Sequence, residues 1–139
     1  MVTVIYDHQF PYSHDLDGRQ YPRLTLRVSN RQDLTQALEI EAYLDSGAQR
    51  SLLSGWIGGA LGLDILQGPQ LTYESTAGIA LTATLHRVRL EHADLGSFDI
   101  EVGFSSAPIR RNLLGRDFFN LLQIGFREHQ LAFYITTSP

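Results

Sequence analysis

The sequence contains no cysteine, and only one methionine and one tryptophan, in a chain of 139 residues. Without cysteine the chain has no disulfide bond, no thiolate nucleophile and no cysteine-ligated zinc. It also lacks an excess of positive charge, because the formal net charge is −4 and the arginines are scattered along the chain. The electrostatic basis for tight binding to a phosphate backbone is missing, so we expect no nucleic-acid partner.

Long apolar runs are absent as well. No window approaches the roughly 18 to 20 apolar residues of a membrane span, and the opening MVTVIYDHQFPYSHD lacks a basic segment followed by a long apolar one. We therefore expect a soluble, cytoplasmic protein with no membrane partner. A chain of 139 residues with 43% hydrophobic content can fill one core, which predicts a single domain over residues 1–139.

Alternating apolar residues, the pattern of a half-buried strand, recur between glycine and proline positions. They predict a hairpin from residues 23–29 and 37–44, a second hairpin over 69–92, and strands over 96–105 and 130–135. Apolar residues at helical spacing predict a short helix within SLLSGWIGGALGLD, residues 51–64, held by packing of residues that include Trp56 and Ile57. A strand followed by a second helix is expected within NLLGRDFFNLLQIGF, residues 112–126. The predicted class is mostly β with one or two short helices.

Asp45 lies in the stretch IEAYLDSGAQRSLLS, where an apolar strand runs directly into an acid, a hydroxyl and a glycine. A D-S-G tripeptide alone is compatible with a turn in which the acid accepts hydrogen bonds from nearby backbone N–H groups. The context indicates more, because the strand supplies rigid support, Gly47 allows close backbone approach and Ala48 is small. The carboxylate of Asp45 is therefore a candidate for chemistry.

Two motifs resemble those of the retropepsin-like aspartic proteases. Residues 45–48, D-S-G-A, match the loop that carries the acid in that family, and residues 113–116, L-L-G-R, match its second element, which precedes a short helix. The resemblance covers roughly residues 23–135, and residues 1–22 would be an N-terminal extension or dimer arm. It implies a closed β-barrel of the acid-protease type that forms a symmetric homodimer.

The chain contains only one D-S-G tripeptide. Aspartic proteolysis needs two carboxylates that share one proton. Two like charges about 3 Å apart cannot both form easily, so one carboxyl group of the pair stays protonated. Asp17, the other acid in a glycine setting, has no strand before it, so DLDG at residues 15–18 predicts a turn. The dyad would be Asp45 and its counterpart in a second chain. We expect an aspartic endopeptidase that cuts peptides and needs no cofactor.

The resemblance also implies roles for other residues. Asp45 would be the acid and base, Ser46 would hydrogen-bond across the two-fold axis, and Gly47 would offer its backbone to the substrate. The hairpin around residues 73–79 would be the flap, and the C-terminal strand would pair with its counterpart in the dimer. The expected substrate-binding residues are Ala48, Gln49, Tyr73, Thr76, Ala77, Gly78, Arg111 and Leu113. Structural support is expected from Gly115 and Arg116.

Departures from the family leave alternatives open. Gln49 stands where retroviral relatives commonly carry an acid that pairs with the arginine of G-R, so Arg116 would lack that partner unless Asp117 replaces it. Arg110 or Arg111 in the cleft wall would favour acidic or polar substrate side chains. The alternative function is a non-catalytic retropepsin-fold dimer that binds or scaffolds peptides, and an ordinary β-barrel is a third interpretation.

The five histidines show no paired ligand spacing, so we expect no metal site.

Overall fold

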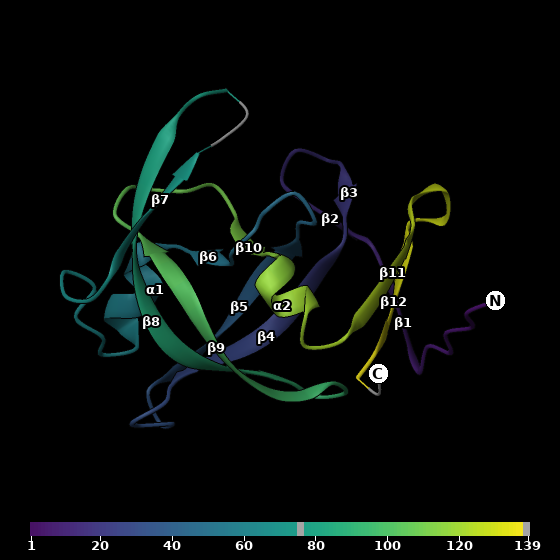
Figure 1. The fold of residues 1–139 in the computed structure, drawn as a ribbon, viewed down its shortest axis with the longest axis horizontal. Helices are drawn as coiled ribbons and strands as arrows, with labels where there is room; N and C mark the ends of the chain where they lie inside the picture. Colours follow the sequence, from purple (N-terminus) through teal and green to yellow (C-terminus); the bar gives the residue numbers. More distant parts are fainter. Residues whose placement is uncertain (75–76, 138–139) are drawn as a thin grey trace.

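The computed structural model describes residues 1–74 and 77–137, and most of its regular structure is β (Figure 1). The strands are β1 (His8–Pro11), β2 (Ser13–His14), β3 (Gln20–Tyr21), β4 (Arg23–Asn30), β5 (Ala37–Leu44), β6 (Leu52–Leu53), β7 (Gln70–Glu74), β8 (Ala80–His92), β9 (Gly96–Ser105), β10 (Asn112–Leu114), β11 (Gln123–Arg127) and β12 (Ala132–Thr136). Two α-helices, α1 (Gly55–Ala60) and α2 (Arg116–Phe119), and a 3₁₀ turn, η1 (Glu128–Gln130), complete the elements.

The larger sheet has seven strands in the order β4-β5-β10-β6-β9-β8-β7, and β4 also pairs with β8. The two predicted hairpins are confirmed as the antiparallel pairs β4–β5 and β7–β8, and the strand predicted over residues 96–105 is β9. β8 and β9 form the longest ladder, from Ala83 opposite Ser105 to His92 opposite Gly96. The tip predicted for the second hairpin includes residues 75 and 76, which lie outside the described residues.

The core is built from the alternating positions that predict the strands. Leu24, Leu26 and Val28 all lie on the inner face of β4 and are at most 2% exposed. Val88 and Leu90 of β8 belong to the same cluster and are fully buried. Burial of one such aliphatic side chain stabilises the fold by about 1.5–3 kcal/mol. The register of the sheet is therefore fixed, because a shift by one residue would turn these side chains toward water.

Helix α1 lies in the predicted segment, but only part of its apolar pattern is buried. Ile57 is fully buried, whereas Trp56 is 65% exposed and does not pack in the core as expected. Gly55 lets the helix approach β9 closely, since a Cβ atom there would lie 2.2 Å from the carbonyl oxygen of Ser105. No helix in the described part of the chain is long and apolar enough to cross a membrane.

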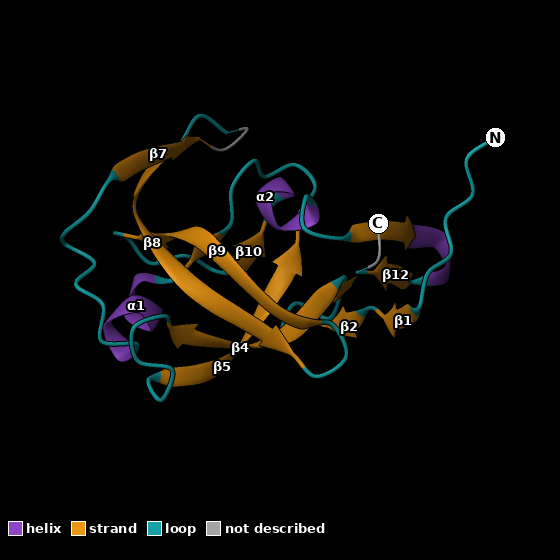
Figure 2. Ribbon diagram, turned by 60° about the horizontal axis from the view of Figure 1, so that its bottom comes forward, coloured by secondary structure: helices purple, strands orange, loops and turns teal. Residues whose placement is uncertain are grey.

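A second sheet of three strands, in the order β1-β12-β11, joins the two ends of the chain. Residues 8–11 pair with residues 132–135, and residues 123–127 pair with residues 132–136 from the other side. Figure 2 shows β1 beside β12. Both edges of β12 are thus occupied within one chain. The expectation that this strand pairs with its counterpart in a second chain is wrong, because β1 and β11 already satisfy its backbone hydrogen bonds.

The segment between the two sheets contains the turn predicted at DLDG. β2 and β3 form a short antiparallel pair, and the N–H group of Gly18 donates to the carbonyl of Asp15 at 3.0 Å. The turn is held against the main sheet by Arg23, whose side chain donates to Ser13 Oγ at 2.7 Å and also to the carbonyl of His14. Residues 12–22 are therefore part of the folded structure.

Candidate active site

The loop that carries Asp45 is supported by β10. This strand lies between β5 and β6, parallel to the first and antiparallel to the second (Figure 1). β5 ends at Leu44 and β6 begins at Leu52, so the loop of residues 45–51 must cross the end of β10 to connect them. The N–H group of Asp45 donates to the carbonyl of Leu114 at 2.9 Å, which ties the loop to that end.

The carboxylate of Asp45 is held by its own loop. The N–H group of Gly47 donates to Asp45 Oδ1 at 2.9 Å, and the N–H group of Ala48 donates to the Asp45 carbonyl at 3.2 Å. Asp45 is half-buried, whereas Ser46 and Gly47 are exposed. Within residues 1–74 and 77–137, no basic side chain forms an ion pair with Asp45. Its second carboxylate oxygen is thus open to an external partner.

The structure brings the two motifs into direct backbone contact through Gly115. A Cβ atom at this position would lie 2.7 Å from the carbonyl oxygen of Ala48 and 2.8 Å from the carbonyl carbon of Arg50. The neighbouring N–H group of Arg116 donates to the same Ala48 oxygen at 2.8 Å. A side chain at position 115 would therefore force the loop of residues 45–51 away from α2.

Ser51 connects this loop to α2 and was not singled out by the sequence. It is fully buried; its hydroxyl donates to Asp117 Oδ1 at 2.7 Å and accepts from the N–H group of Gly115 at 3.0 Å. Its own N–H group contacts both carboxylate oxygens of Asp117 at 3.0 Å. We call Ser51, Asp117 and Gly115 the Ser51 cluster. The available signal was a hydroxyl residue placed directly before the buried pair of β6.

Asp117 therefore pairs with Ser51 and does not replace the missing partner of Arg116. In the described part of the chain, the Arg116 side chain forms no ion pair. Gln49 is exposed, and the adjacent Arg50 pairs with Glu101 of β9 at 3.4 Å. The departure at Gln49 thus leaves the Arg116 guanidinium at the surface without a carboxylate.

Tyr73 lies opposite Leu81, close to the turn of the β7–β8 hairpin, and ties the hairpin to the loop of residues 45–51. Its hydroxyl donates to the carbonyl of Ser51 at 3.1 Å. Burial, with the nearby charge of Asp117 as a smaller cause, raises the pKa of Tyr73 to about 12, so the hydroxyl remains a donor at neutral pH. Ala77 and Gly78 are exposed in the nearby connection between β7 and β8, and Thr76 lies outside the described residues.

β10 supplies two further contacts. Leu113 is half-buried and lies opposite Leu52 of β6. Asn112, which the sequence did not single out, accepts a hydrogen bond from the N–H group of Ser54 at 2.9 Å and donates to the carbonyl of Glu41 at 3.0 Å. Its side chain thus links the chain after β6 to β5 and holds the strand that supports Asp45.

Arg111 contacts the β2–β3 turn. Its guanidinium pairs with Asp15 at 3.0 Å and Asp17 at 3.2 Å, and it lies over the rings of Tyr21 and Tyr43 at 4.4 and 4.8 Å from their centroids. Hydrogen bonds from the Arg19 N–H group and the Tyr21 hydroxyl, with the charge of Arg111 as a smaller cause, lower the pKa of Asp17. We call Arg111, Asp15 and Asp17 the Arg111 latch. The charge that was expected to face substrate is already balanced within the chain.

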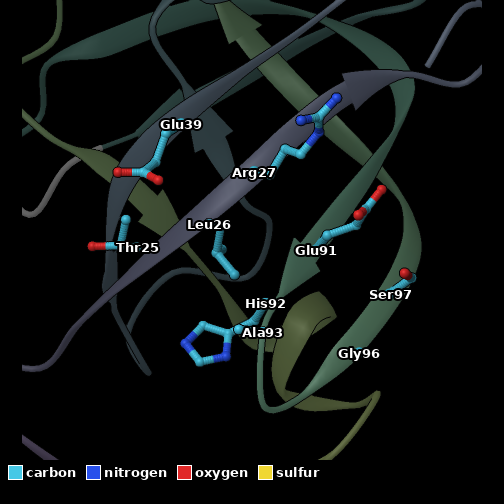
Figure 3. Close-up of a pocket in the computed structure, with 9 residues that line it drawn as sticks. All are labelled: Thr25, Leu26, Arg27, Glu39, Glu91, His92, Ala93, Gly96 and Ser97. Atoms are coloured by element: carbon cyan, nitrogen blue, oxygen red, sulfur yellow. The ribbon is translucent and has the colours of Figure 1, made fainter. Parts of the chain in front are cut away.

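Two hollows flank the main sheet. The first, of about 680 Å³, lies beside Gln49 and Arg50 and reaches β8, β9 and α2; we call it the loop hollow. The second, of about 360 Å³, is formed by β4, β5 and the β8–β9 turn and contains Glu39, Glu91 and His92 (Figure 3). No residue of the loop at Asp45 lines this second hollow, so only the first adjoins the candidate active site.

The chain has the fold of the retropepsin-like aspartic proteases. It is similar to the crystal structure of a retropepsin-like aspartic protease from Rickettsia conorii, with a TM-score of 0.62 and 16% sequence identity over 97% of this chain and 96% of that one. It is also similar to EIAV protease in complex with the inhibitor HBY-793, with a TM-score of 0.54 and 15% identity over 78% of this chain and 91% of that one. No protein-family model and no curated protein sequence matches the chain.

Proposed function

We infer that the chain is an aspartic endopeptidase that hydrolyses peptide bonds with a water molecule activated between two Asp45 carboxylates of a homodimer. The observation that carries this inference is the placement of Asp45. Its carboxylate stands on a loop fixed by β10 and is held on one oxygen by the Gly47 N–H group. It has no basic partner in the described part of the chain, and the surrounding fold is that of aspartic proteases.

The chemistry requires one ionised and one protonated carboxylate. The ionised Asp45 takes a proton from water as the water oxygen attacks the peptide carbonyl carbon, while the protonated Asp45 hydrogen-bonds the carbonyl oxygen. A proton then passes to the peptide nitrogen, and the C–N bond breaks to give a carboxylic acid and an amine. The Gly47 N–H group keeps each carboxylate in one orientation through these steps.

The dimer must use surfaces other than the edges of β12, which are filled within one chain. In the proposed complex Ser46 lies at the two-fold axis, and Ala48, Gln49 and Leu113 line the cleft beside Asp45. Ala77 and Gly78 belong to the hairpin that covers the substrate, which binds as an extended strand. Tyr73 would act from the end of β7 next to the turn of that hairpin.

The test is peptide cleavage by purified protein between pH 4 and 7, measured by mass spectrometry on a diverse peptide mixture. We expect cleavage by the wild type and by Asp94→Asn, an exposed control in the β8–β9 turn, but none by Asp45→Asn. Equal cleavage by Asp45→Asn would place the activity elsewhere. Peptide binding without cleavage by the wild type would instead indicate the non-catalytic dimer.

The mass in solution is an independent test. Sedimentation velocity at assay concentration should give twice the mass of 15.6 kDa. A strict monomer that still cleaves peptides would contradict a dyad formed by two Asp45 residues.

A further inference from the structure

The loop hollow is lined by equal numbers of basic and acidic side chains, but two of its arginines form no ion pair in the described part of the chain. Arg50, Arg87 and Arg116 line it together with Asp99, Glu101 and Asp117. Glu101 pairs with Arg50, and the Asp117 carboxylate accepts three hydrogen bonds from Ser51.

Asp99 pairs with two arginines outside the hollow, Arg31 at 3.5 Å and Arg89 at 3.1 Å. Arg116 has no carboxylate within ion-pair distance in residues 1–74 and 77–137, and Arg87 acts on Asp99 only at longer range. The exposed guanidinium groups of Arg87 and Arg116 therefore have no ion-pair partner in the described part of the chain, although the net charge of the chain is −4.

The hollow adjoins the loop that carries Asp45. Gln49 belongs both to its wall and to that loop, and the Arg116 N–H group donates to the carbonyl of Ala48. Gln49 is four positions after Asp45 in the chain, so their Cα atoms lie at most about 14 Å apart. An extended peptide advances about 3.3 Å per residue. A side chain up to about four residues from the bond above Asp45 would therefore reach the hollow.

We propose that the loop hollow is a subsite for an acidic side chain of the bound peptide, with Arg116 and Arg87 as the residues that recognise its carboxylate. Guanidinium groups match carboxylates in shape and can bind them through two parallel hydrogen bonds. The uncharged Gln49 leaves this role open, because an acid there would compete for Arg116. The inference rests on the proposed binding of peptides at Asp45, and it adds the class of side chain that the site selects.

The experiment uses the Asp45→Asn protein, which should bind peptides without cutting them. Fluorescein-labelled decapeptide libraries that carry Glu at one defined position are titrated against matched libraries with Gln, by fluorescence anisotropy. We expect Glu at one position to bind about threefold to fivefold tighter at low salt, as for a pair of partly exposed charges. The preference should disappear in 0.5 M NaCl, because salt screens exposed charges.

Three exposed arginines provide the matched variants. Arg116→Gln should abolish the preference for Glu, Arg87→Gln should reduce it, and Arg127→Gln, at the end of β11 away from the hollow, should leave it unchanged. Equal affinity for the Glu and Gln libraries, an unchanged preference in the Arg116→Gln, Arg87→Gln double variant, or no peptide binding would each overturn the proposal.

The outcomes also separate this proposal from the proposed function. Cleavage by the wild type with the same kcat/KM for Glu and Gln peptides would overturn the subsite and leave the endopeptidase in place. A preference for Glu in binding, without any cleavage by the wild type, would support the subsite and contradict the endopeptidase.

Discussion

The Ser51 cluster and the Arg111 latch each fasten a distant segment to one end of β10, the first in the interior and the second at the surface. Ser51 is fully buried and forms its hydrogen bonds with Asp117 and the backbone of Gly115. Arg111 keeps about a quarter of its side chain exposed and forms ion pairs with two acids of the β2–β3 turn. The same strand is thus held by a buried network after Leu114 and by partly exposed ion pairs before Asn112.

The difference predicts where stability resides. A buried donor or acceptor that loses its partner destabilises the fold by its full desolvation free energy, because no water replaces the partner. An exposed ion pair loses little when it is broken, since water and salt already screen it. The support of the Asp45 loop should therefore depend strongly on the Ser51 cluster and weakly on the Arg111 latch.

The largest effect is expected for Gly115→Ala. The added methyl group would overlap backbone atoms of residues 48 and 50, which cannot move without shifting the loop. The variant should lose about 3 kcal/mol in the free energy of unfolding, measured by urea denaturation. Gly59→Ala is the control, because a Cβ atom there meets open space in α1 and should stabilise the helix by up to about 1 kcal/mol. Equal behaviour of the two variants would contradict the close contact.

Ser51→Ala should cost about 2 kcal/mol, because the Gly115 N–H group and the Asp117 carboxylate would both lose a buried partner. Urea denaturation is again the measurement. The control is Ser106→Ala, whose exposed hydroxyl donates to the carbonyl of Thr82 and whose loss should cost less than about 0.5 kcal/mol. A loss for Ser51→Ala as small as that of the control would show that the cluster does not hold the loop.

Arg111→Gln should cost about 1 kcal/mol at low ionic strength, from the two ion pairs and the contacts with two tyrosine rings. In 1 M NaCl the ionic part should vanish, whereas the loss in Ser51→Ala should persist. The comparison is made from urea midpoints at both salt concentrations. If salt does not reduce the loss in the free energy of unfolding caused by Arg111→Gln, the Arg111 latch behaves like a buried network and not like exposed ion pairs.

The smallest effect is the pH dependence of the latch. The pKa of Asp17 is lowered in the folded chain from its ordinary value of 3.8. A lowered pKa contributes stability that is present above the unfolded value and is lost as the pH falls through the folded value. The urea midpoint of the wild type should therefore exceed that of Asp17→Asn at pH 7 and pH 5, and the difference should shrink toward pH 3. A constant difference from pH 7 to pH 3 would contradict the assignment.

The sequence predicted the parts of the fold that periodicity controls. The alternation of Leu24, Leu26 and Val28 located a strand with one buried face, and the β4–β5 and β7–β8 hairpins follow from such patterns. The two motifs, residues 45–48 and 113–116, predicted the resemblance to retropepsin-like aspartic proteases that the similar structures support. These features could be predicted because each depends on residues close together in the chain or on a known motif.

The remaining features depend on pairings over long sequence distances. β1 is a four-residue strand that ends in a proline, too short and irregular for a pattern, and yet it fills one edge of β12. The second helix, expected within residues 112–126, ends at Phe119, and residues 123–127 form β11 with backbone partners in β12. The roles of Ser51 and Arg111 likewise depend on carboxylates that are distant in the sequence, Asp117 for Ser51 and Asp15 and Asp17 for Arg111.

The position of β10 has a consequence for the order of folding. This strand of three residues pairs in parallel with Ala42–Leu44, from which it is separated by half of the chain. A long loop must close before such a contact forms, which makes the pairing slow compared with the β4–β5 hairpin. During synthesis, Asp45 emerges early but receives its backbone support only after Leu114 has been made. A growing chain therefore carries Asp45 without its backbone support, and the proposed proteolytic site forms only after residues 112–114 have been made.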